Sequence, residues 1–410
     1  MRLRVLVAPS GFKESLGADE VADCITAGVR RAVPDALIRK APIPDGGEGF
    51  AQALVKTVGG SLRDVQVTGP VGDPVQAYFG LLAPQHDNAT TTGSTTGTSS
   101  APGPVGETAV LEMAAAAGLR HVPRDRRDPL RTTTRGVGEL IVAALDAGAR
   151  RVLIGCGDSG TNDGGAGMAQ ALGVRLLDAN GADLGPGGGQ LTELAHIDLS
   201  GLDARLADTT IDVACNWTNV LTGPSGVARV YGPQKGASEQ TVTQLEAALE
   251  RYADVIESDL GVNVRTAPGS GASGGLGAGI SALLGGTLHP RFDVVTRYLD
   301  FDELLERTDL VITAEGAIDR QSARGKVPAE VARRAGLRDI PVLALTGTVG
   351  EGVQAALDAG LDAYASILTR PCTLEEALAD ARESLTSSAE QTMRMLLVGR
   401  RLAWQEQETH

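Results

Sequence analysis

Short apolar segments alternate with amphipathic segments at both ends of this 410-residue chain, and this alternation constrains the fold more than any other feature. Near the start the pattern predicts strands at 4–8 and 37–43 and helices at 18–33 and 49–58. Beyond residue 300 it predicts further strands at 310–313, 342–346 and 363–368, separated by helices. Such alternation is typical of a parallel sheet covered by helices, which places the chain in the α/β class.

The middle of the chain follows a different pattern, which predicts a second domain. Two alternating runs at 61–69 and 74–83 indicate antiparallel strands. We therefore expect one Rossmann-like parallel-sheet domain built from residues 1–70 and 286–410, with a mixed α/β domain inserted at 71–285. Residues 86–106 are rich in Thr, Ser and Gly, and we expect them to form a surface loop without a catalytic role.

The composition narrows the classes of partner. A formal net charge of −14 argues against binding to nucleic acid or to an anionic membrane, because either would need a basic face. No apolar run reaches the roughly 20 residues of a membrane span, and the first residues lack a signal-peptide pattern. The four cysteines show no metal-binding spacing. We expect a cytoplasmic protein that acts on a small molecule, and a homo-oligomer stays open.

Glycine-rich loops are the strongest indication of a ligand. Six of the thirteen positions 155–167 are glycine, and they follow an apolar strand predicted at 151–154. The run 155–160 matches the dinucleotide pattern GxGxxG, with Asp178 about twenty residues later, and 269–274 matches it again. However, Asp163 and two further glycines fall where the crossover helix would begin, so a pyrophosphate there would meet a bare anion.

A divalent cation resolves this conflict, since Mg²⁺ binds carboxylates and phosphate oxygens together. Asp163 then holds the metal, and the same reasoning applies to Asp45 and Glu48 and to Glu315 and Asp319, each pair at the end of a predicted strand. The chain has only five lysines, and three of them lie in glycine-rich or Pro-Gly segments where an ammonium group can face phosphate: Lys13, Lys235 and Lys326. The chain has no P-loop sequence.

Seven sequence blocks resemble the type I glycerate kinase family, in order and over nearly the full length. They read APSGFKESL, PIPDGGEG, TAVLEMAAAAGL, GCGDSGTNDGGAGMAQALG, ACNWTNVLTGPSGVARVYGPQKGA, PGSGASGGLGA and LVITAEGAIDRQSARGKVPAEVA. The resemblance implies a two-domain α/β kinase that uses ATP and Mg²⁺ to phosphorylate D-glycerate to 2-phosphoglycerate, in a cleft between its domains. The motif loops depart from the family's usual sequences at several positions, among them Ser10, Asp158, Asn216 and Ala317.

Together these patterns predict a set of site residues. The predicted catalytic residues are Lys13, Asp45, Asp163, Asp319 and Lys326. The residues predicted to bind the nucleotide are Gly155, Gly157, Ser159, Asn162, Lys235, Gly271 and Gly274, and those predicted to hold the metal are Asp163 and Glu315. Either Asp45 or Asp319 would accept the proton of the acceptor hydroxyl, and the sequence does not choose between them. Replacement of Asp163 by alanine is expected to remove turnover and to leave the fold intact.

Two other functions stay open at this point. An NAD-dependent oxidoreductase would place Asp178 near a ribose. A homologue without catalytic activity would bind a nucleotide or a sugar acid, and the altered motif loops are the reason to consider it.

Overall fold

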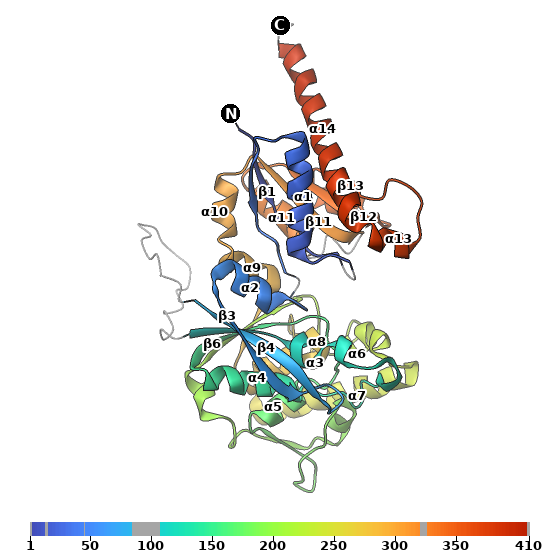
Figure 1. The fold of residues 1–410 in the computed structure, drawn as a ribbon. Helices are drawn as coiled ribbons and strands as arrows, with labels where there is room; N and C mark the ends of the chain where they lie inside the picture. Colours follow the sequence, from blue (N-terminus) through green and yellow to red (C-terminus); the bar gives the residue numbers. More distant parts are fainter. Residues whose placement is uncertain (1, 13–14, 45, 84–106, 320–325, 408–410) are drawn as a thin grey trace. The chain divides into compact units, whose positions relative to one another are not determined.

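The protein consists of two compact units, described here from a computed structural model that covers residues 2–12, 15–44, 46–83, 107–319 and 326–407. The first unit contains Met1–Asp45 and Phe292–His410, and the second contains Gly46–Arg291 (Figure 1). Each unit has a sheet with associated helices, which confirms the α/β class. Among the helices of the described ranges, none is both long enough and apolar enough to cross a membrane.

The first unit is built on a five-stranded sheet in which all neighbouring strands are parallel. In sheet order the strands are β13 (Ala363–Ser366), β12 (Val342–Val349), β11 (Leu310–Ile318), β1 (Arg4–Val7) and β2 (Leu37–Lys40). The N-terminal and C-terminal parts of the chain therefore join in one sheet, where β1 pairs with β11, as the alternation in both parts predicted.

The helices of the first unit connect or cover these strands. They are α1 (Ala18–Ala32), α9 (Arg291–Tyr298), α10 (Phe301–Glu306), α11 (Val327–Gly336), α12 (Gln354–Asp358), α13 (Leu374–Ala379) and α14 (Ala381–Gln407). Helices α1 and α14 lie side by side, and their buried side chains share one core with β1 and β11 (Figure 1). Gly28 makes this close packing possible, because a Cβ there would meet the backbone of α14.

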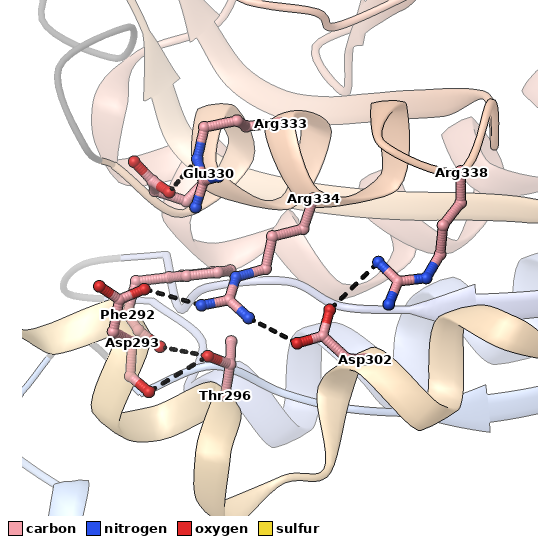
Figure 2. A network of polar contacts seen from close by, with 8 residues as sticks. All are labelled: Phe292, Asp293, Thr296, Asp302, Glu330, Arg333, Arg334 and Arg338. Carbon is pink, nitrogen blue, oxygen red and sulfur yellow. Dashed lines mark hydrogen bonds and ion pairs between the residues drawn. The ribbon is translucent and has the colours of Figure 1, made fainter. Parts of the chain in front are cut away.

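Arg334 on α11 ties together the helices by which the chain returns to the first unit (Figure 2). Its guanidinium group pairs with Asp293 of α9 at 2.7 Å and with Asp302 of α10 at 2.8 Å. It also lies 5.4 Å from the ring centre of Phe292, a cation–π contact. Arg338 adds a second pair to Asp302 at 3.2 Å. Because Arg334 is only 17% exposed, these charges anchor α9 immediately after the boundary between the units.

The second unit is built on a mixed six-stranded sheet. In sheet order its strands are β10 (Thr287–Pro290), β9 (Thr210–Cys215), β6 (Ala149–Gly155), β5 (Glu107–Glu112), β4 (Pro74–Leu82) and β3 (Gly60–Thr68). The first four are parallel to one another, while β3, β4 and β5 pair antiparallel. A separate pair, β7 (Arg175–Leu177) and β8 (His196–Asp198), is antiparallel.

Seven α-helices and several single turns complete the described part of the second unit. The helices are α2 (Phe50–Val58), α3 (Met113–Ala117), α4 (Arg135–Asp146), α5 (Ala166–Ala171), α6 (Val227–Tyr231), α7 (Glu239–Leu260) and α8 (Ala272–Leu283). The short 3₁₀ turns are η1 (Leu119–His121), η2 (Arg124–Arg126), η3 (Gly188–Glu193), η4 (Ala204–Asp208) and η5 (Pro233–Lys235). Apolar side chains of α3 to α8 form one large core with those of the sheet.

The boundaries of the units differ from those expected from the sequence. The first boundary lies at residue 45 instead of 70, and the second at 291 instead of 285. The reason is strand pairing: β3 pairs with β4 along its whole length, from Gly60 to Thr68, so it cannot belong to another unit. Helix α2 packs on β4 and β5 and stays with them. The predicted surface loop at 86–106 lies outside the described residues.

Candidate active site

The first unit brings candidate residues together where the sheet reverses its direction of winding. The chain leaves β1 through α1 toward β2, but leaves β11 through α11 toward β12 on the opposite side. In open α/β sheets, ligands bind outside the carboxyl ends of the strands at such a switch point. The loop after β1 is fixed to β11 here, because both the amide and the hydroxyl of Ser10 donate to the carbonyl oxygen of Ala314, at 2.9 and 3.0 Å.

Three of the predicted site residues gather at this point. Strand β11 is longer than predicted and continues through the AEGAI motif to Ile318, so it carries Glu315 within the strand and is followed directly by Asp319. Lys326 immediately precedes α11, and its Nζ lies 3.4 Å from Oε1 of Glu315 and 3.8 Å from Oδ1 of Asp319. The side chains are 27%, 19% and 35% exposed, respectively, so solvent reaches all three.

The second unit contains a buried cluster around Lys235, which comes from η5. Its Nζ donates to Oγ of Ser159 at 2.9 Å, to the carbonyl oxygen of Thr161 at 2.6 Å and to Oδ1 of Asn162 at 2.8 Å. Three acceptors use all three N–H groups of an ammonium ion. Burial lowers the pKa of Lys235 to about 7, although the charge of Asp163 opposes this shift. Lys235 therefore fixes the loop after β6 from inside the protein.

Asp163 is completely buried and accepts hydrogen bonds from four donors. Its Oδ2 accepts the amide of Thr134 at 2.7 Å, the hydroxyl of Thr134 at 2.9 Å and the amide of Gly167 at 3.2 Å, while Oδ1 accepts the amide of Gly165 at 3.2 Å. Burial raises its pKa, and these hydrogen bonds oppose the rise. The carboxylate joins the start of α4 to the start of α5. These contacts describe a structural anchor, and a metal-holding role for Asp163 stays a prediction.

The glycines predicted to bind the nucleotide allow backbone segments of this protein to pack together. A Cβ on Gly155 would lie 2.5 Å from the ring of Phe50, and a Cβ on Gly157 would lie 2.7 Å from Cα of Gly47. A Cβ on Gly271 would meet the carbonyl of Val220, and one on Gly274 would meet that of Thr161. Gly274 also has a left-handed backbone, with φ of 75°. Packing alone is a sufficient reason for these four glycines, and their contact with a nucleotide stays a prediction.

The dinucleotide-binding hypothesis is not supported by the fold. In a Rossmann unit the helix begins at the third glycine and leads to a parallel neighbouring strand. Here α5 begins only at Ala166 and has six residues, and the following strand β7 pairs with β8 outside the main sheet. Asp178 accepts the amides of Asn180 and Ala182 in an exposed turn.

Glu112 is a buried acid beside a motif loop that the sequence alone did not single out. It ends β5, is fully buried, and accepts the amides of Gly49 at 3.1 Å and Ala51 at 3.0 Å and the hydroxyl of Tyr78 at 2.5 Å. These two amides belong to the start of α2, so Glu112 caps this helix from another element. Burial raises its pKa despite these donors. A single acid within the apolar run TAVLEMAAAAGL was the signal that could have identified it.

Three of the named departures from the family motifs have a structural explanation. Asp158 has a φ of 48°, a left-handed conformation that glycine adopts freely and that aspartate tolerates better than most residues. Ser10 is buried and bonded to β11, as described above. Oδ1 of Asn216 accepts the amide and hydroxyl of Thr218, which closes a local turn. Ala317 lies in β11 opposite Thr348, and nothing in the structure explains its replacement of arginine.

The predicted site residues with polar or charged side chains form two groups within the described part of the chain. Glu315, Asp319 and Lys326 lie together in the first unit, and Ser159, Asn162, Asp163 and Lys235 lie together in the second. Lys13 and Asp45 lie outside the described residues. Partly exposed acids and a lysine at the switch point of a parallel sheet lie where α/β enzymes bind small-molecule ligands.

Comparison with known proteins identifies the family. A sequence model described as "Glycerate kinase family" matches residues 5–397. The glycerate kinase of Bacillus subtilis (strain 168) is 45% identical over 387 residues, which cover 94% of this chain and 96% of that protein. The glycerate 2-kinase of Escherichia coli (strain K12) is 44% identical over 401 residues, which cover 98% and 100%. A crystal structure from Salmonella typhimurium LT2, of a protein provisionally named glycerate kinase 2, matches with a TM-score of 0.78 at 44% identity, covering 98% of this chain and all of that one.

The chain belongs to the glycerate kinase family, as the motif blocks indicated. It is a kinase, a phosphotransferase that acts on a hydroxyl group. Neither the oxidoreductase nor the homologue without catalytic activity is favoured by these similarities.

Proposed function

We propose that this protein transfers the γ-phosphoryl group of ATP to the 2-hydroxyl of D-glycerate, giving 2-phosphoglycerate and ADP. The observation that carries the proposal is similarity over nearly the whole chain to proteins named glycerate kinase and glycerate 2-kinase. In this reaction the hydroxyl oxygen forms a bond to the γ-phosphorus, the bond to the ADP oxygen breaks, and the hydroxyl proton passes to a base. Such transfers depend mainly on positioning and on neutralisation of charge.

The cluster at the end of β11 supplies groups suited to this chemistry. Lys326 would place a positive charge near the transferred phosphoryl group, and Asp319 would accept the hydroxyl proton. Asp319 is the choice among described residues, and Asp45 stays the alternative predicted from the sequence. Both candidate carboxylates of the cluster keep some exposure to solvent, which a group that meets substrate requires.

Mg²⁺ fits the donor chemistry of the same cluster. This ion prefers carboxylate oxygens and binds through one or two of them together with phosphate and water. Glu315 would hold it, beside Lys326, and the ion would neutralise the charge of the phosphates. Asp163 fits less well, because both its oxygens already accept hydrogen bonds in a fully buried setting. Within the described part of the chain, no three His, Cys, Asp or Glu side chains are grouped to hold a metal by themselves.

A direct assay tests the proposal. The purified protein is incubated with ATP and Mg²⁺ and with D-glycerate, L-glycerate, lactate or glycolate, while ADP release is measured and the product is assigned by ³¹P NMR. D-Glycerate should give the highest kcat/KM and phosphate on the 2-oxygen. Phosphate on the 3-oxygen, or a better acceptor within the panel, would show that the assigned acceptor is wrong.

Variants of the cluster test the roles of its members. Asp319→Asn should lower kcat about 100-fold or more, as expected for loss of a general base, with little change in KM. Lys326→Met should lower kcat/KM by a similar factor. Asp198→Asn, at a partly exposed aspartate of β8 in the second unit, is the control and should keep wild-type kinetics. Wild-type activity of Asp319→Asn would transfer the role of base to another residue.

A further inference from the structure

Asp158 holds an unusual position at the carboxyl end of β6. It is a non-glycine residue in the left-handed region, with φ of 48°, a conformation that costs free energy for residues with a Cβ. Its backbone carbonyl accepts the amide of Leu119 at 2.8 Å, so the residue itself is held in place. Its carboxylate is exposed but is not directed at random: Oδ2 accepts the amide of Glu48 at 3.2 Å.

The same carboxylate covers Gly47. A Cβ on Gly47 would overlap Oδ2 of Asp158 and would lie 2.8 Å from its Cγ. Beneath it, the backbones of Gly47 and Gly157 pack so closely that a Cβ on Gly157 would lie 2.7 Å from Cα of Gly47. Glycine at 47 and aspartate at 158 are therefore fitted to each other.

Two other charged side chains hold the same four-residue segment. Glu112 accepts the amide of Gly49, and Arg120 pairs with the carboxylate of Glu48 at 3.3 Å. The segment Gly46–Gly49 is thus anchored by residues from β5, from η1 and from the loop after β6. It forms the second half of the motif PIPDGGEG, and two of its glycines have left-handed backbones, Gly46 and Gly49. A segment with three glycines loses much conformational freedom when it is fixed, so it needs several anchors.

We infer that Asp158 is a positioning residue for phosphoryl transfer. It fixes the Gly46–Gly49 segment, which directly follows Asp45, the alternative base predicted from the sequence, because its carboxylate accepts the Glu48 amide and packs against Gly47. The inference rests on the proposed function only for its effect on turnover. We call the contacts of the Asp158 carboxylate with the Glu48 amide and with Gly47 the Asp158 lock. The lock lies within the second unit, so it can be measured without substrate. It also explains why an aspartate replaces glycine at a position where glycine would be free of strain.

Amide hydrogen exchange at Glu48, measured by NMR, tests the lock directly. In Asp158→Gly the amide loses its acceptor and should exchange about three- to tenfold faster, the loss expected for one hydrogen bond. Asp158→Asn keeps a carbonyl acceptor and should restore most of the protection. Asp198→Gly removes another aspartate that accepts a backbone amide, that of Ser200 at 2.8 Å, and should leave exchange of the Glu48 amide unchanged.

A double-mutant cycle with Gly47→Ala separates the lock from a general effect on stability. The new methyl group displaces the Asp158 carboxylate, so Gly47→Ala alone should reproduce the faster exchange of Asp158→Gly. Combined in one protein, the two substitutions should be no worse than either alone. Asp158→Gly also relieves the left-handed strain, so global stability should hold while protection at Glu48 falls.

Kinetics then test the consequence for the reaction. Asp158→Gly should lower kcat/KM for the phosphoryl acceptor about three- to tenfold, and Asp158→Asn should recover it. Unchanged exchange at Glu48 in Asp158→Gly, or additive effects in the cycle, would overturn the lock. Faster exchange with unchanged kcat/KM would overturn the positioning role. Absence of turnover with D-glycerate in the wild-type protein would refute the proposed function. The amide-exchange measurement at Glu48 would still test the lock, because it needs no substrate.

Discussion

Replacement of Lys235 by methionine should remove a rise in the stability of the second unit between pH 7 and pH 8.5. The ammonium group is buried, with 2% of the residue exposed, and it bonds only to neutral acceptors in the loop after β6. Burial without a directly bonded carboxylate explains why the pKa of Lys235 falls from its ordinary value of 10.5 to about 7. The unfolded chain keeps this proton up to about pH 10.5, whereas the folded protein releases it near pH 7.

The sign and size of the effect follow from proton linkage. Between pH 7 and pH 10.5 the unfolded state binds more protons at Lys235, so the free energy of unfolding rises with pH in this window. From pH 7 to pH 8.5 this single group contributes about 1.5 kcal/mol. The absolute stability of Lys235→Met is a poorer test. In Lys235→Met the folded state no longer buries a charged group, which raises the free energy of unfolding. It also leaves three hydrogen-bond acceptors without a donor, which lowers the free energy of unfolding, and the two effects are each several kcal/mol.

The assay is urea unfolding at pH 6.5, 7, 7.5, 8 and 8.5, followed by tryptophan fluorescence. The chain has two tryptophans, so a Trp404→Phe background leaves Trp217 as a reporter for the second unit. Lys56→Met, at an exposed lysine of α2, is the matched control and should keep the wild-type slope. The range ends at pH 8.5 because the pKa of the buried thiol of Cys215 is raised to about 12, which opposes the rise at higher pH. Parallel pH profiles for wild type and Lys235→Met would refute the depressed pKa.

Three further substitutions test the anchors of the fold. Asp163→Ala should destabilise the second unit by roughly 3–5 kcal/mol in urea unfolding, because it leaves several buried donors without an acceptor. The buried contacts thus predict a different outcome from the intact fold that was expected from the sequence, and the unfolding measurement decides between the two. Glu112→Gln should lower stability by about 1–2 kcal/mol and speed exchange of the Ala51 amide, since an amide group cannot accept with both of its heteroatoms. Arg334→Met should cost the first unit about 1–2 kcal/mol in thermal unfolding, as its partners are partly solvated, and high salt should reduce this difference.

The arrangement of strands could be predicted from the sequence, because hydrophobic periodicity reflects burial directly. The strands of the first unit lie where the periodicity placed them, and β3 and β4 are antiparallel as expected. The sequence pattern was less informative about which distant strands pair with each other. Periodicity identified β3 but gave no partner for it, so the boundary was placed at 70, after this strand. Likewise the AEGAI motif looked like a loop, although pairing with β12 extends β11 through it.

Individual roles in the site were harder to predict, because they depend on which side chains tertiary contacts bury. A lysine in a Pro-Gly segment suggests a ligand-facing charge, yet Lys235 donates all its hydrogen bonds inward. An aspartate in place of a motif glycine suggests lost contact with an anion, yet Asp158 bonds the Glu48 amide. Local sequence showed that these groups lie in glycine-containing segments, but it carries no information on the partner that each group finds there.

Burial divides the acids of the motif loops into two classes with different chemistry. Glu112 and Asp163 are fully buried, and each uses both oxygens to accept donors from helix starts and loops. A carboxylate bound in this way could meet a metal or a substrate only after breaking several hydrogen bonds at a cost of several kcal/mol. Glu315 and Asp319 keep exposure to solvent and lie beside the ammonium group of Lys326, so the cost of bringing a phosphate or an ion to them is far smaller. We therefore expect the buried acids to shape the loops, and the partly exposed acids at the end of β11 to be those that reach the substrate in the proposed reaction.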